Sequence, residues 1–128
     1  MNCNDIVKVS FDEIKPFIKD AKKEQVSFVN NQFCHWYGMK HNGTLVAFFC
    51  LMVKGGTARF KSNYTVPAYR RNGFLGNFIL FSKNVCAIMG VKKMTCFCTK
   101  MSLKQHVRAG AIVVSRRKHD ITFVKYTF

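Results

Sequence analysis

The stretch YTVPAYRRNGFLGNF, residues 64–78, combines a strand end, a short turn and a helix start. Residues 58–66 alternate between apolar and polar types, which predicts a strand, and Pro67 ends it. From Gly73 onward apolar residues recur at helical spacing as far as Met89, and Gly90 is a stop signal. The sequence therefore predicts a strand–turn–helix unit.

The turn of this unit has the residue types of a pyrophosphate site. Backbone N–H groups at a helix start have no partner within the helix and carry the positive end of its dipole, and glycine lets a phosphate approach them closely. Arg70 and Arg71 add positive charge at the same place. Ordinary strand-to-helix turns also contain such residues, so the turn favours a phosphate ligand without identifying it.

Further elements are expected on both sides of this unit. Before it we expect a strand over 6–9, a helix that begins at Ser10, a second helical piece over 25–33, and strands over 36–40 and 44–53. After it we expect a strand over 91–98, a helix over 102–108, and strands over 111–115 and 121–126. This order predicts an α+β fold with a mixed, mostly antiparallel sheet and one parallel crossover through the central helix. Because no repeat or linker interrupts the chain, we expect a single domain over residues 1–128.

The lead-in Val66-Pro67-Ala68-Tyr69, together with Arg70 and Gly73, resembles the acetyl-CoA loop of the GNAT superfamily of N-acetyltransferases, Arg/Gln-x-x-Gly-x-Gly/Ala. The order of predicted elements is similar to that family from about residue 6 to residue 126. One departure is that Leu75 stands at the second small position and Gly76 follows one residue later. The resemblance implies a GNAT-like acyl-CoA-dependent N-acyltransferase with acetyl-CoA as co-substrate. The residues that it implies for binding acetyl-CoA are Tyr64, Val66, Arg70, Arg71, Asn72, Gly73, Phe74, Leu75 and Gly76.

Two histidines are candidates for proton transfer. His106 falls where the family commonly has a tyrosine that protonates the departing CoA thiolate, and an imidazole can do this near neutral pH. The alternative is a half-buried helix histidine bonded to a carbonyl. His35 falls where a GNAT chain passes the acceptor pocket, so it is a candidate base or stacking platform, or else an ordinary residue at the sheet edge. The usual carboxylate base has no counterpart on the strands predicted over 58–66 and 91–98, which is compatible with an acceptor amine of low pKa.

The charge of the chain points to a polyanionic partner. Lys and Arg number 21 against 6 Asp and Glu, which gives a formal net charge of +15. Basic and aromatic residues mix outside the phosphate turn, and the run Arg116, Arg117 and Lys118 is the candidate nucleic-acid contact. We therefore expect an acceptor amine on a nucleic acid or associated with one, such as a DNA base or aminoacyl-tRNA. The chain also has a looser similarity to phage Mom-type DNA-modification enzymes. Protein-lysine acetylation and a GNAT-fold binding module without catalysis stay open.

The cysteines have the pattern of reduced core residues. Cys50, Cys86, Cys96 and Cys98 lie within apolar stretches, which indicates a reducing compartment, and we expect a cytoplasmic protein. Cys96 and Cys98 share one face of a predicted strand, but no second pair at zinc spacing accompanies them, so no metal is expected. The longest apolar run, 45–53, is too short to span a membrane, and no membrane partner is expected.

Overall fold

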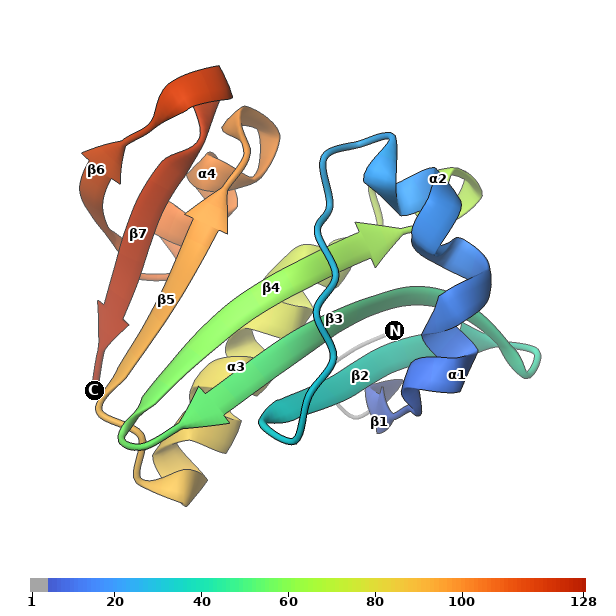
Figure 1. The fold of residues 1–128 in the computed structure, drawn as a ribbon, viewed down its shortest axis with the longest axis horizontal. Helices are drawn as coiled ribbons and strands as arrows, with labels where there is room; N and C mark the ends of the chain where they lie inside the picture. Colours follow the sequence, from blue (N-terminus) through green and yellow to red (C-terminus); the bar gives the residue numbers. More distant parts are fainter. Residues whose placement is uncertain (1–4) are drawn as a thin grey trace.

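The computed structural model describes residues 5–128 and contains a seven-stranded sheet (Figure 1). The strand of the predicted strand–turn–helix unit is the central strand of this sheet, and the helix packs on it. The strands are β1 (Val7–Lys8), β2 (Cys34–His41), β3 (Thr44–Lys54), β4 (Thr57–Thr65), β5 (Lys93–Cys98), β6 (Ile112–Arg116) and β7 (Thr122–Thr127). The helices are α1 (Phe11–Ile14), α2 (Ile18–Lys22), α3 (Phe74–Met89) and α4 (Lys100–Arg108), with short 3-10 turns η2 (Lys15–Phe17), η3 (Pro67–Tyr69) and η4 (Lys118–Asp120). Residues 1–4 of the predicted domain lie outside this description.

The sheet has the order β1-β2-β3-β4-β5-β7-β6, and β4 and β5 are the pair that runs parallel, joined through α3. The predicted fold class and the crossover through the central helix are therefore confirmed. In β4 only Thr57–Arg59 pair with β5, and their partners are Lys93–Thr95. Beyond those residues the two strands part, so the sheet opens toward the end of β4 (Figure 1).

Two apolar cores lie on opposite faces of the sheet. On one face, α1 and α2 pack over β1–β4 on a core that contains Ile14, Trp36 and Phe48. On the other face, α3 and α4 pack on a core that contains Phe49 and Phe78 and that continues under β5 and β7. Along a strand alternate side chains point to opposite faces, so neighbouring Phe48 and Phe49 enter different cores. In the described residues no helix lies over the other face of β5, β7 and β6 (Figure 1).

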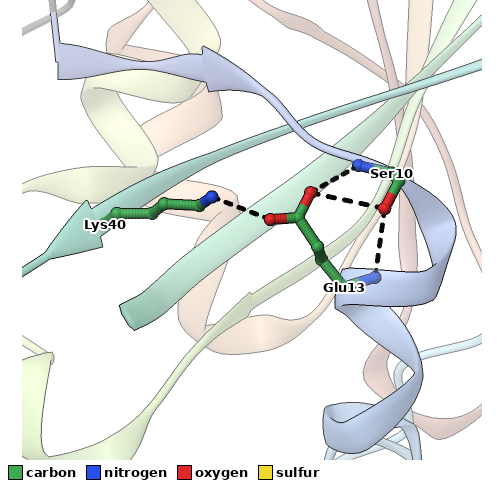
Figure 2. Close-up of polar contacts among 3 residues, drawn as sticks. All are labelled: Ser10, Glu13 and Lys40. Atoms are coloured by element: carbon green, nitrogen blue, oxygen red, sulfur yellow. Dashed lines mark hydrogen bonds and ion pairs between the residues drawn. The ribbon is translucent and has the colours of Figure 1, made fainter. Parts of the chain in front are cut away.

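The N-terminal helix begins as predicted at Ser10, in a reciprocal capping arrangement (Figure 2). The Ser10 hydroxyl accepts from the Glu13 backbone N–H at 3.3 Å, and a Glu13 carboxylate oxygen accepts from the Ser10 backbone N–H at 2.8 Å. The second oxygen of the same carboxylate pairs with Lys40 of β2 at 2.7 Å. One glutamate therefore both caps α1 and attaches it to the sheet.

The prediction of a helix over 25–33 is wrong. Gln25 has a left-handed backbone with φ of 67°, which ends the helical region, and residues 26–30 have no regular structure. The segment runs across the face of the sheet that α2 covers, where the Ser62 hydroxyl donates to the Ser27 carbonyl at 2.6 Å (Figure 1). The first helix is also interrupted at η2, which contains Pro16, because proline cannot donate the backbone hydrogen bond that a continuous helix needs. None of the helices described over residues 5–128 has the length and apolar character to cross a membrane.

Candidate active site

The start of α3 is an open cradle for an anion. Arg71 and Gly73 both have left-handed backbones, with φ of 66° and 74°, and Asn72 between them donates to the Tyr69 carbonyl at 2.8 Å. No side chain caps α3, so its first N–H groups are left for solvent or a ligand. A Cβ placed on Gly73 or Gly76 would meet no atom within 4 Å, so no other part of the protein crowds the backbone at these two glycines.

The side chain of Arg70 is held by contacts within the protein, and its predicted part in binding acetyl-CoA stays a prediction. Its guanidinium pairs with both oxygens of Glu24 at 2.7 Å, donates to the Thr65 carbonyl at 2.9 Å, and lies over the Tyr64 ring. These contacts attach the turn to the end of α2. In this arrangement Arg70 positions the loop, and Arg71, which is exposed, is the cation left free to face a phosphate.

The remaining predicted residues divide by burial. The Tyr64 side chain is buried in the α1–α2 core, and Phe74 is buried in the α3–α4 core. Burial raises the pKa of the Tyr64 hydroxyl. Val66 and Leu75 are half-buried and pack against the two cores. These four residues can therefore meet a ligand through backbone groups, while their side chains fix where the backbone runs.

A β-bulge interrupts β4 at the level where the sheet opens, and the continuous strand predicted over 58–66 did not include it. The pairing between β3 and β4 shifts register between Phe48 and Cys50, and Ser62 on β4 is left-handed with φ of 56°. The next residue, Asn63, has a buried side-chain oxygen without a hydrogen-bond partner. Such an acceptor is costly to leave unpaired, so it is available to a ligand N–H. Two small polar residues within a strand pattern were the only sequence signal.

His106 is a buried residue, 1% exposed, on α4. Its Nδ1 lies 2.7 Å from the Tyr126 hydroxyl, its Nε2 lies 3.7 Å from the Cys96 sulfur, and its ring packs edge-on against Phe60. His106 is therefore shielded from solvent. Its ring is hydrogen-bonded to a tyrosine, whereas the alternative interpretation expected a half-buried histidine bonded to a carbonyl. Its role as an acid stays a prediction.

Cys96, Cys98 and His106 form one buried cluster, with all three donor atoms within 4.8 Å of one another. The Cys96 thiol donates a hydrogen bond that lowers the pKa of Cys98 to about 6, and the same pairing raises the pKa of Cys96. The shared strand face of the two cysteines was predicted. The packing of α4, which brings the histidine, was not, because it depends on contacts between distant segments.

His35 lies away from the cradle. It pairs with Leu51 on β3, and Leu51 pairs with Phe60 on β4, which is five residues before the end of that strand. At the rise of an extended strand this is about 16 Å from the start of the turn. Burial, and then the charge of Lys8, lower the pKa of His35. The structure brings His35 together with neither the cradle nor the cluster of His106, because the cradle lies along β4 from it and both β3 and β4 separate it from β5.

The run Arg116, Arg117 and Lys118 lines an open concavity beside β6 and β7. The Arg117 guanidinium lies 5.4 Å from the Phe97 ring centre and 5.6 Å from that of Phe123. A second guanidinium, from Arg59 of β4, lies 5.1 Å from the Phe97 ring. We call this set, Arg59, Phe97, Arg117 and Phe123, the arginine–aromatic surface. It occupies the sheet face that no helix covers.

The fold is that of the GNAT N-acetyltransferases, as solved structures show. The ribosomal-protein-S18-alanine N-acetyltransferase from Escherichia coli is 12% identical, with 95% of this chain and 92% of that chain covered and a TM-score of 0.78. An acetyltransferase of the GNAT family from Staphylococcus aureus is 10% identical (95% and 97% covered, TM-score 0.75). A Bacillus subtilis acetyltransferase in complex with CoA is 11% identical (96% and 97% covered, TM-score 0.72). No family profile and no curated protein matches the sequence. The resemblance to GNAT proteins is thus confirmed as a likeness of fold.

Proposed function

We propose that this chain is an acyl-CoA-dependent N-acyltransferase with acetyl-CoA as the donor. The observation that carries the proposal is the uncapped start of α3, with open space at Gly73 and Gly76, which follows the end of β4 beyond the residues that pair with β5. This is the segment whose sequence resembles the GNAT acetyl-CoA loop. The presence of CoA in a structure of the same fold supports the choice of donor.

The residues present fit the donor at two points. The N–H groups at the start of α3 can hold the pyrophosphate, with Arg71 adding charge. Farther along β4, the unpaired Asn63 oxygen can accept from an amide N–H of the pantetheine arm. Gly73 and Gly76 leave room for the phosphates, so the shift of the second small residue by one position does not close the cradle.

In the proposed reaction, the amine nitrogen attacks the thioester carbonyl, a C–N bond forms, and the C–S bond breaks. The amine loses one proton and the departing thiolate takes one up. The described parts of β4 and β5 carry no Asp or Glu, which suits an amine that is already neutral, such as the exocyclic amine of a base. His106 is the proposed proton source for the thiolate.

We propose further that the acceptor amine is on a nucleic acid or associated with one. From residue 25 to the C-terminus Asp120 is the single acidic residue, whereas basic residues occur throughout. The arginine–aromatic surface supplies cations and ring faces together, which suits phosphates and stacked bases. Protein-lysine acetylation and a binding module without catalysis are the alternatives that experiment must separate.

The donor site is tested by titration calorimetry with acetyl-CoA and the variant Gly73→Asp. Aspartate tolerates the left-handed backbone and meets no protein atom, so the fold should survive while the negative charge repels the pyrophosphate. We expect loss of affinity by at least about 100-fold. Gly55→Asp is the matched control, because Gly55 is also left-handed with free space around it but lies in the turn at the other end of β4. No heat with the wild-type protein, or equal loss in both variants, would contradict the donor site.

The acceptor is tested by supplying radiolabelled acetyl-CoA with duplex DNA, total tRNA, or a lysate cleared of nucleic acid. Label on DNA or tRNA is the expected result. Label only on protein in the cleared lysate would replace the nucleic-acid acceptor with a protein amine. Binding of acetyl-CoA without label on any acceptor would favour the binding module.

A further inference from the structure

The buried cluster of Cys96, Cys98 and His106 has the donor atoms of a metal site. Two thiols and one imidazole nitrogen lie within 4.8 Å of one another, and each side chain is at least 95% buried. Sulfur and imidazole together are the ligands that Zn²⁺ prefers in proteins. Within the described residues this is the only group of three such donors, and neither the phosphate cradle nor the arginine–aromatic surface includes it.

The hydrogen bonds of His106 prepare its Nε2 as a ligand. The Tyr126 hydroxyl can donate to the His106 carbonyl at 3.3 Å and accept from Nδ1–H at 2.7 Å. A proton on Nδ1 leaves the lone pair of Nε2 facing the thiols. A ligating histidine usually holds its other nitrogen in a hydrogen bond of this kind, which fixes both the tautomer and the ring orientation.

The scaffold holds the three side chains from independent elements. Cys96 and Cys98 are two residues apart on β5 and so share one face, toward α4. The Lys83 ammonium on α3 donates to the Ala109 carbonyl at the end of α4 at 2.8 Å, which ties that helix in place. Phe60 of β4 packs against the histidine ring. The donors are therefore arranged by packed core elements rather than by a loop.

Charge balance favours a divalent ion, and the sulfur and imidazole donors favour Zn²⁺ among these. Two thiolates and a neutral imidazole around Zn²⁺ sum to zero, which suits a buried place, whereas Cu⁺ would leave one uncompensated negative charge. We propose that Cys96, Cys98 and His106 bind a single Zn²⁺ through both sulfurs and Nε2, with the two thiol protons released on binding. Among the described residues no fourth donor completes the zinc tetrahedron. A zinc-bound Nε2 carries no proton, so the zinc proposal excludes the role as proton source proposed above for His106, and a chain that holds the ion must protonate the thiolate through another group.

The test uses reduced full-length protein and does not depend on acyl transfer. Native mass spectrometry should show one Zn²⁺ per chain, and Co²⁺ should give thiolate-to-metal charge-transfer absorption. Because the three donors are brought together only in the folded chain, saturating Zn²⁺ should raise the Tm by on the order of 10 °C, and a chelator should reverse this. A folded wild-type protein with neither the added mass nor the absorption would overturn the proposal without affecting the donor site.

Substitutions test which side chains hold the ion. Cys98→Ser should abolish the cobalt absorption. Tyr126→Phe, which removes the hydroxyl that contacts Nδ1 and the His106 carbonyl but none of the three donors, should weaken Zn²⁺ binding by about 10–100-fold. Cys86→Ser is the matched control, since Cys86 is a buried core cysteine on α3 outside the cluster, and it should bind normally. If the absorption survives in Cys98→Ser and disappears in Cys34→Ser, the ion binds elsewhere and the proposal is wrong. If Cys98→Ser does not fold, the wild-type measurements and Tyr126→Phe still decide.

Discussion

The two halves of the sheet, on either side of the place where β4 and β5 part, differ in both packing and charge. The β1–β4 half has apolar cores on both faces, whereas β5, β6 and β7 are covered by helices on one face (Figure 1). Five of the six acidic residues lie within the first 24 positions, and four of these, Asp12, Glu13, Asp20 and Glu24, take part in ion pairs. The covered half thus stabilises the fold, and the second half keeps cations and ring faces available to a ligand.

The largest effect expected from this difference concerns stability. Phe48 is buried and its ring contacts four other aromatic rings, so Phe48→Ala should lower the free energy of unfolding by about 3–5 kcal/mol. Phe97 is 42% exposed on the uncovered face, and Phe97→Ala should cost at most about 1 kcal/mol through lost cation–π contacts. Urea unfolding of both variants measures the difference. Equal losses would show that the second half has a core of its own on that face.

The next effect concerns binding. Replacing Arg116, Arg117 and Lys118 together by glutamine should weaken binding to duplex DNA. It should also flatten the slope of log K against log salt by the equivalent of up to about three phosphate contacts. Each contact that is lost reduces the number of counterions released on binding. Fluorescence anisotropy at several salt concentrations gives the slope, and acetyl-CoA affinity should stay unchanged.

The matched control for that variant is the covered half. Lys19, Lys22 and Lys23 are exposed at α2, and replacing them by glutamine removes the same charge from the other side of the molecule. We expect a much smaller change of slope. If the two triple variants behave alike, the net charge alone attracts DNA, and the run Arg116, Arg117 and Lys118 has no special role.

Most of the fold could be predicted from local patterns. The alternation in residues 58–66 and the helical spacing between Gly73 and Gly90 correctly predicted β4 and α3. The prediction of a helix over 25–33 failed because the apolar residues of this segment, such as Phe28, pack on the sheet from a chain that crosses it in extended form. Periodicity in a short window does not distinguish such a segment from a helix.

The candidate site was predictable only in part. The turn from Arg70 to Gly76 was found because its residues are consecutive. The pairing of Arg70 with Glu24, 46 residues away, and the joining of His106 to Cys96 and Cys98 depend on tertiary packing, so no spacing in the sequence reports them. The unpaired oxygen of Asn63 follows from a bulge, which a strand pattern does not show.

A smaller effect is expected in the covered half, at the cap of α1 (Figure 2). Ser10→Ala removes the side-chain acceptor for the Glu13 N–H and should lower the free energy of unfolding by about 1 kcal/mol. Ser10→Asp is the conservative control, because aspartate supplies an equivalent acceptor. Chemical unfolding measures both variants. Equal destabilisation by alanine and aspartate would show that the cap does not contribute to stability.

The same site gives the covered half a dependence on acid. The hydrogen bond from Lys40, and then that from the Ser10 backbone, lower the pKa of Glu13 below 4.5 in the folded chain. The unfolded chain therefore binds the proton first as the pH falls, so the contribution of Glu13 is present above about pH 4.5 and is lost below it. Glu13→Gln should flatten the fall of unfolding free energy in this range. Because the carboxylate is well exposed, the change should be small, and a curve parallel to the wild type would mean that the Lys40 contact does not link α1 to β2 in solution.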